Sequence, residues 1–176
     1  MRPQGQAILK SAILGLVAGG LAACFGPSEE GSETFGYVDP NDPQVAAATA
    51  EALKHLPAFW SKFDSKAPGC SDFTIKVELP TDAGKLPEAI WVDVLEHPST
   101  GKIVGRLANE PVNIAALHEG DRVEVDPSRI VDWSYTRGEV TYGHFTTRAL
   151  FKYMPADARA KLEAWLPPTP LEPQLN

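Results

Sequence analysis

The sequence predicts an α+β fold, in which a strongly bent antiparallel sheet is flanked by N-terminal and C-terminal helices. Apolar residues recur with helical spacing after residue 42 and again near the C-terminus. Between these segments, apolar and polar residues alternate with the period of two that is typical of strands. Short turn sequences separate the alternating segments, which favours antiparallel hairpins. A partial SH3-like barrel is one form that such a bent sheet can take.

The first predicted helix begins after Asp42, with Pro43 at its first position. Aspartate caps a helix N-terminus through its carboxylate, and a proline there loses no hydrogen bond. Apolar residues then follow one helical face as far as Leu56. We expect Pro57 to kink or restart the helix, and Trp60 with its aromatic neighbours to continue the apolar stripe through a second short helix.

Period-two alternation from Asp72 onward predicts half-buried strands. The expected strands cover residues 73–79, 90–94, 103–107, 123–125, 130–136 and 140–142. A turn at 98–101 should join the second and third into one hairpin, and a turn at 137–139 should join the last two into another.

Two helices are expected near the C-terminus. Thr146 is a candidate cap for a helix that runs through Met154, and Pro155 opens a last helix over residues 156–166. Residues 167–176 are rich in proline and cannot continue that helix, so we expect an extended or disordered tail.

The N-terminus has the features of a bacterial lipoprotein signal peptide over residues 1–23. Arg2 and Lys10 flank the start of an uncharged apolar run that is too short to span a bilayer. The run ends in Leu21-Ala22-Ala23-Cys24, which resembles a lipobox. The resemblance implies cleavage before Cys24 and lipid, palmitate included, on its sulfur and new amino group, so that the membrane is a partner. The alternatives are an ordinary secretory peptide and a buried helix that happens to end in Cys.

Lipidation at Cys24 would place the protein in the bacterial cell envelope, facing the periplasm. Phe25 stands where an Asp would favour inner-membrane retention under enterobacteria-like sorting, so the outer membrane is expected in a Gram-negative organism. Residues 24–41 are expected to comprise the lipidated Cys and a flexible tether rich in Gly, Pro, Ser and acidic residues. Residues 42–166 then form a single folded domain.

The chain has 176 residues and a formal charge of −7, and it becomes more acidic if the basic signal peptide is removed. An acidic balance argues against nucleic-acid binding, which requires clustered Lys and Arg to neutralise phosphates. It favours a basic or neutral partner, such as an envelope protein or a cell-wall component.

Several segments keep their order along the chain and carry a family resemblance. They are 56–60 (Leu-Pro-Ala-Phe-Trp), 72–77, Glu88 with Trp91-Val92, 105–111, Leu117 with 120–123, 132–135 and 143–148. Together they resemble the YegJ-like bacterial family, a domain of unknown function numbered 2314. The resemblance covers about residues 44–151 and implies a fold but no activity. The family often has a His where this chain has Ala89, so any role of that His is absent here.

Candidate catalytic groups are few. Cys70 is the thiol that remains after lipidation of Cys24, and it has no activating neighbour in the sequence. The spacing of metal ligands is missing, and neither a metal nor a cofactor is expected. This leaves one form of enzyme hypothesis, in which Cys70, or a carboxylate such as Asp132, acts with His144. The remaining histidines are His55, His97 and His118.

The polar and aromatic members of the family-like segments make up a candidate binding face: Asn109, Asp121, Asp132, Trp133, Tyr135 and Arg148. Trp133 and Tyr135 point to the same side of a strand, so they could stand at a rim as contact anchors. The structural alternative is that Asn109 satisfies loop backbone and Asp121 suits a turn. In that alternative Arg148 pairs with Asp132 and locks the last helix to the sheet.

Three functional hypotheses follow. The first is an envelope-anchored lipoprotein with a small non-catalytic binding or scaffold domain. The second is an immunity-type inhibitor of a toxin, which rests on analogy with other small acidic α+β domains. The third is the enzyme that uses Cys70 or Asp132 with His144.

Overall fold

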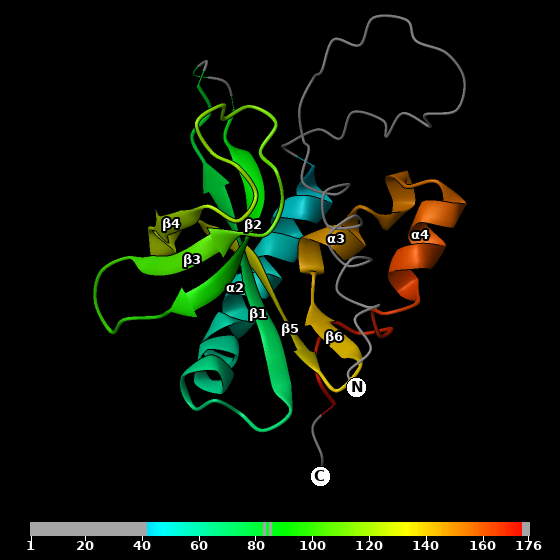
Figure 1. The fold of residues 1–176 in the computed structure, drawn as a ribbon. Helices are drawn as coiled ribbons and strands as arrows, with labels where there is room; N and C mark the ends of the chain where they lie inside the picture. The colour runs from blue at the N-terminus through cyan, green and yellow to red at the C-terminus, as the bar shows by residue number, and fades with distance from the viewer. Residues whose placement is uncertain (1–41, 83, 85, 174–176) are drawn as a thin grey trace, which may run out of the picture.

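A computed structural model describes residues 42–82, 84 and 86–173, and it contains a six-stranded antiparallel sheet with helices at both ends (Figure 1). The strands are β1 (Cys70–Leu79), β2 (Glu88–Glu96), β3 (Ile103–Leu107), β4 (Arg122–Val125), β5 (Ile130–Arg137) and β6 (Val140–Gly143). The helices are α2 (Pro43–Asp64), α3 (Phe145–Ala149) and α4 (Ala156–Glu163), with 3₁₀ turns η1 (Pro127–Arg129) and η2 (Phe151–Tyr153). The predicted signal peptide and tether, Cys24 included, lie outside the described residues.

The strand order is β4-β3-β2-β1-β5-β6, so the α+β prediction is confirmed. Both expected hairpins are present, because β2 pairs with β3 and β5 pairs with β6. The described sheet is open, with β4 and β6 at opposite edges, and it is not closed into a barrel. Among the helices of the described residues, none combines the length and apolarity that a membrane span requires.

Helix α2 begins as predicted, because the Asp42 carboxylate accepts the backbone N–H of Gln44 at 2.7 Å. The expected kink or restart at Pro57 is wrong, since the helix runs unbroken to Asp64. Pro57 lies on the exposed face of α2, whereas Ala52 and Phe59 are buried against the sheet. Packing of the inner face keeps the helix continuous. Pro57 has no N–H for the carbonyl four residues before it, and on the outer face water can donate to that carbonyl instead.

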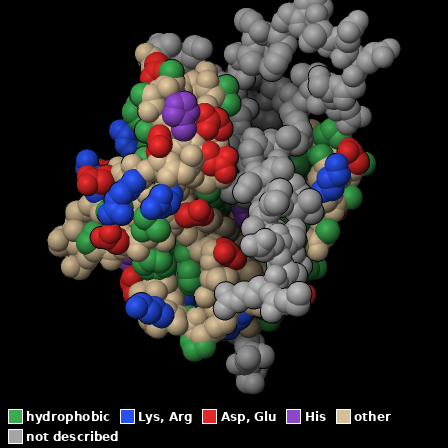
Figure 2. Space-filling view, in the orientation of Figure 1, with side chains coloured by type: hydrophobic (Ala, Val, Ile, Leu, Met, Phe, Trp, Pro, Cys, Tyr) green, Lys and Arg blue, Asp and Glu red, His purple; other side chains and the backbone are tan. Residues whose placement is uncertain are grey.

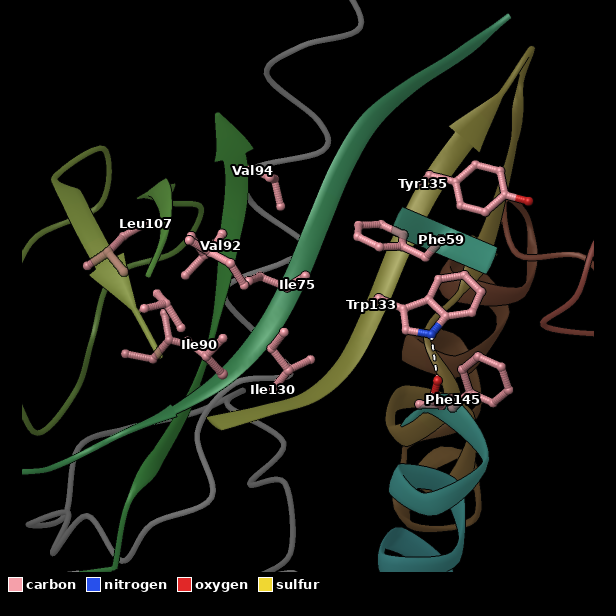
Figure 3. Close-up of a cluster of buried hydrophobic side chains, with 14 of the residues drawn as sticks. Phe59, Ile75, Ile90, Val92, Val94, Leu107, Ile130, Trp133, Tyr135 and Phe145 are labelled. Atoms are coloured by element: carbon pink, nitrogen blue, oxygen red, sulfur yellow. Dashed lines mark hydrogen bonds between the residues drawn. The ribbon is translucent and has the colours of Figure 1, made fainter. Parts of the chain in front are cut away.

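Helix α2 covers one face of the sheet and forms the aromatic core with it (Figure 3). The indole N–H of Trp133 donates to the backbone carbonyl of Ala52 at 2.7 Å, and the Trp133 ring lies 5.5 Å from that of Phe59. Trp133 and Tyr135 are each only 2% exposed. The expectation that these two rings stand together at a rim is therefore wrong, because α2 packs on the face they share.

The opposite face of the sheet is also covered, so β1 is not the half-buried strand that was expected. Lys76 lies between Trp91 and Asp132 in the strand register, and all three side chains are buried. The turn that leads from β6 into α3 packs over this row, with the His144 ring 4.6 Å from that of Trp91. Gly143 permits this approach: its φ is +86°, and a Cβ there would lie 2.1 Å from the Trp133 carbonyl oxygen.

The C-terminal region differs from its prediction in three ways. The helix expected from Thr146 to Met154 is divided into α3 and η2, and α4 ends at Glu163 rather than residue 166. The tail is not disordered over 167–173: the carbonyl of Pro170 accepts the backbone N–H of Gly143 at 2.7 Å, and Leu171 packs against the core.

Candidate functional site

The long connection between β3 and β4, residues 108–121, is the site where irregular backbone is most heavily fixed by side chains. We call it the β3–β4 loop. Its start is tied to β2: the backbone N–H of Ala108 donates to the Trp91 carbonyl at 2.8 Å, and the Trp91 N–H donates to the Asn109 side-chain oxygen at 2.9 Å. Asn109 is buried, so its amide replaces the strand partner that Trp91 would otherwise lack.

Glu88, the first residue of β2, holds the middle of the β3–β4 loop. Its carboxylate accepts the backbone N–H groups of Val112 at 2.7 Å and Asn113 at 2.8 Å, and the Asn113 side-chain amide at 3.3 Å. The residue is only 1% exposed. Charge-assisted bonds from a buried carboxylate are among the stronger ones in proteins, so this segment of backbone has little freedom.

Sequence reasoning assigned no role to Glu88, although a signal was present. Glu88 has the same parity in β2 as the core residues Ile90 and Val92, so the alternation already directed its carboxylate inward. A charged side chain in the inward register of a strand needs internal partners, and the backbone of the β3–β4 loop supplies them.

Three further carboxylates complete the scaffold of this loop. Asp82 accepts the N–H of Ala115 at 2.7 Å, and Asp121 accepts the N–H of His118 at 2.8 Å. Glu110 accepts the N–H of Glu119 at 2.7 Å and bonds to the His118 ring at 2.8 Å. The pKa of Glu110 is lowered by the bond from the Glu119 backbone and then by His118, and Glu110 raises the pKa of His118.

An apolar side chain projects from this fixed backbone. Val112 is 64% exposed, and Leu86, in the neighbouring β1–β2 connection, is 55% exposed. The two connections are joined by the bond from the Asp82 N–H to the Asn113 carbonyl at 3.1 Å. Figure 2 shows acidic side chains and a histidine gathered at this end of the molecule. The arrangement presents exposed apolar side chains on two connections that also carry acidic groups, which suits recognition of a partner more than chemistry.

A second polar cluster lies beneath α3, on the buried face of the central strands. The Lys76 ammonium donates to the Thr146 hydroxyl at 3.4 Å, and that hydroxyl donates to the Asp132 carboxylate at 2.7 Å. Burial lowers the pKa of Lys76, and Asp132 opposes this shift. Burial also raises the pKa of Asp132, against the bonds from Thr146 and the charge of Lys76. Both groups are therefore shifted towards their neutral forms.

The hydrogen bonds of Asp132 hold the backbone in place. Its carboxylate accepts the backbone N–H groups of Trp133, Phe145 and Thr146 at 2.8, 3.2 and 2.8 Å, so it caps the start of α3. The proposed ion pair between Asp132 and Arg148 is not formed. Arg148 instead donates to the carbonyls of Gly143 at 3.1 Å and Pro167 at 2.5 Å.

The residues of the enzyme hypothesis are only partly brought together. His144 lies in the same cluster as Asp132, but its ring faces Thr147 and lies tilted against Trp91 and edge-on to Trp165. Burial, then the charges of Lys76 and Arg148, lower the pKa of His144 to about 3. Cys70 lies apart from this cluster, opposite Arg137 at the far end of the β1–β5 pairing. In residues 42–173, without 83 and 85, no three His, Cys, Asp or Glu side chains are grouped to hold a metal ion.

The six residues of the candidate binding face therefore separate into different environments. Asn109 and Asp121 lie in the β3–β4 loop, where each satisfies backbone as the structural alternative expects. Trp133 and Tyr135 belong to the core, and Asp132 belongs to the cluster beneath α3.

Comparison with known proteins relates the chain to bacterial sequences. The family described as "Uncharacterized protein conserved in bacteria (DUF2314)" matches residues 42–166. The chain is 28% identical over 139 residues to "Uncharacterized protein YegJ" of Escherichia coli (strain K12), a match that covers 76% of this chain and 90% of that protein. No solved structure matches the chain significantly.

A second similar protein is "Putative ankyrin repeat protein NMB1133/NMB1171" of Neisseria meningitidis serogroup B (strain ATCC BAA-335 / MC58). It is 28% identical over 140 residues, which cover 76% of this chain and 55% of that protein. The chain thus spans about half the length of this relative.

Proposed function

The chain belongs to the bacterial family DUF2314, and from this premise we propose that it is an envelope-anchored lipoprotein whose folded domain is a non-catalytic binding module. The lipobox-like sequence at Cys24 supports the anchor. The β3–β4 loop supports the binding role, and we assign it as the contact surface for a protein partner in the envelope.

One observation carries the binding role: Val112 is largely exposed, yet its backbone N–H is held at 2.7 Å by the buried Glu88 carboxylate. Irregular connections as long as the β3–β4 loop are usually either functional or disordered, and side chains order this one. A loop ordered before binding loses less entropy in the complex, which increases affinity for a given contact area.

The charge of the loop indicates the chemistry of the partner. Glu110, Glu119 and Asp82 lie in the β3–β4 loop or in the connection bonded to it, and the whole chain carries a charge of −7. A matching surface offers an apolar patch for Val112 and a basic rim for the carboxylates. Opposite charges at the rim increase the association rate and reject acidic proteins, while the apolar centre supplies affinity.

The test is site-specific crosslinking in cells that make the full chain. A photoreactive residue at Val112 should crosslink one discrete protein, and the same residue at Leu53, exposed on the outer face of α2, should not. Val112→Asp should abolish co-purification of that protein with the chain, whereas Leu53→Asp on exposed α2 should not. The proposal would be contradicted by identical crosslinks from both positions, or by a partner that co-purifies with Val112→Asp as well as with wild type.

A further inference from the structure

The segment after α4 covers the free edge of strand β6. We call residues 167–173 the C-terminal strap. The Gly143 N–H donates to the Pro170 carbonyl at 2.7 Å, and just before the strap the Thr141 N–H donates to the Trp165 carbonyl at 3.4 Å. An edge strand with free N–H groups is a template for any extended chain that can pair with it. Here the chain's own C-terminal segment takes that place.

The strap also inserts a carboxylate into a cluster of donors. Glu172 accepts the Lys62 ammonium at 2.8 Å and the Tyr135 hydroxyl at 3.1 Å, and it forms an ion pair with Arg137. Burial opposes ionisation of Glu172, but the bonds from Lys62, Arg137 and Tyr135 outweigh it, so the pKa of Glu172 is lowered. The donors come from α2 and β5, and Leu171 adds an apolar contact beside them.

The lining and the occupant of this site differ in their relation to the family. Lys62, Tyr135, Arg137 and Gly143 all lie within the family match, which ends at residue 166. The strap lies after it. The edge and the donor cluster therefore lie inside the matched range, and the segment that fills them lies outside it.

We propose that the β6 edge and the Lys62–Tyr135–Arg137 cluster form a binding site for an extended acidic peptide of a partner protein, and that the strap occupies this site in cis. The peptide would accept the Gly143 N–H with a backbone carbonyl and place a glutamate two residues further on, as Pro170 and Glu172 do. This combines pairing at a sheet edge with capture of a carboxylate by two cations.

The composition of the strap indicates the composition of the partner peptide whose site it occupies. Prolines favour an extended backbone, so a proline-containing peptide loses little conformational entropy on binding. Prolines also lack the backbone N–H, so they leave no donor without an acceptor in the site. A segment tethered beside its site competes at a high effective concentration, so an external peptide binds weakly until the strap is displaced. Glu172 remains 20% and Arg137 38% exposed, so water and a competing carboxylate can reach the cluster. This surface is separate from the β3–β4 loop.

The test uses the full chain and a fluorescent peptide with the sequence of residues 166–173 (Leu-Pro-Pro-Thr-Pro-Leu-Glu-Pro). Glu172→Lys should expel the strap, because the new ammonium faces Lys62 and Arg137, and should bind the peptide at least about tenfold more tightly than wild type. A peptide with Gln in place of Glu should bind this variant about tenfold more weakly. The matched control is Glu124→Lys on the opposite edge strand β4, which should bind like wild type.

Amide hydrogen exchange shows whether the strap has moved in a folded chain. In Glu172→Lys the Gly143 N–H should exchange faster than in wild type and slow again with peptide, while the Val92 N–H on central strand β2 stays protected. Leu171→Asn provides a second way to release the strap without a change of charge. The proposal is overturned if a variant with a released strap does not bind the peptide, or if the Glu and Gln peptides bind equally well. It is also overturned if neither variant increases exchange of the Gly143 N–H, or if the variants only form dimers that exchange straps.

Discussion

The carboxylate of Asp132 holds Thr146 twice, through its backbone N–H at 2.8 Å and its hydroxyl at 2.7 Å. The two residues lie on β5 and at the start of α3. Their contact explains how a polar residue at the centre of a sheet becomes fully buried: it supplies the cap that α3 requires. The same contact takes up the bonding capacity that a catalytic carboxylate would need.

We predict that Asp132→Ala destabilises the chain by about 3–5 kcal/mol, because it removes the cap of α3 and leaves the buried Lys76 without the carboxylate that counters its desolvation. The measurement is urea unfolding. Asp126→Ala, which removes an exposed cap of η1, should cost clearly less. Adding Lys76→Met to Asp132→Ala should recover part of the loss, and a double variant as unstable as the sum of both singles would contradict the coupling.

We predict that His144 makes the fold sensitive to mild acid. Its pKa is about 3 in the folded chain against 6.5 for the free group, so below pH 6.5 the unfolded chain takes up a proton that the folded chain does not. The free energy of unfolding should therefore fall by up to about 1.4 kcal/mol per pH unit between pH 6.5 and 5. His144→Asn, which tolerates the left-handed backbone, should flatten this slope. An unchanged slope would show that His144 is not its source.

We predict the opposite sign for His118, which gains a partner on folding. Glu110 raises its pKa above 6.5, so the bond contributes fully below pH 6.5 and is lost as the pH rises through the raised pKa. An NMR titration of the His118 ring should show the raised pKa, and Glu110→Gln should return it towards 6.5. Glu124→Gln, remote on β4, is the control and should leave the titration unchanged.

We predict that Glu88→Ala loosens the β3–β4 loop without exposing the core. Val112 and Asn113 would lose their shared acceptor, at a cost of about 1–3 kcal/mol for the loss of charge-assisted bonds to a buried carboxylate. Amide exchange at these two residues should rise, and crosslinking from position 112 should weaken although Val112 itself is unchanged. Partner capture at wild-type level by a chain with a freely exchanging loop would contradict the role of preorganisation.

We predict that a fatty-acid probe labels the chain at Cys24. Labelling should persist in Cys70→Ser, the control that removes the other cysteine, and disappear in Cys24→Ser. The labelled protein should be found with membranes. Equal labelling of the two variants, or a labelled Cys24→Ser chain, would remove the anchor from the proposed function.

Local chemistry made part of the fold and of the site predictable. The cap at Asp42, both hairpins and the alternating strands depend on neighbours within a few residues, and the structure contains each of them. For Asn109 the structural alternative to the binding face holds, because its amide oxygen accepts the Trp91 N–H as an amide beside a strand end commonly does. The role of Glu88 was not expected, because its partners lie more than twenty residues away in the chain.

The sequence by itself determined where helices and hairpins start and turn, the α+β class, and the acidic charge of the chain. Only the tertiary structure decided that Trp133 and Tyr135 are core, that Arg148 bonds to backbone rather than to Asp132, and that the proline-rich strap closes the β6 edge. Period-two alternation reports which residues share a face, but not whether that face is covered. Burial and the choice of polar partners depend on what packs from distant parts of the chain, which no local pattern encodes.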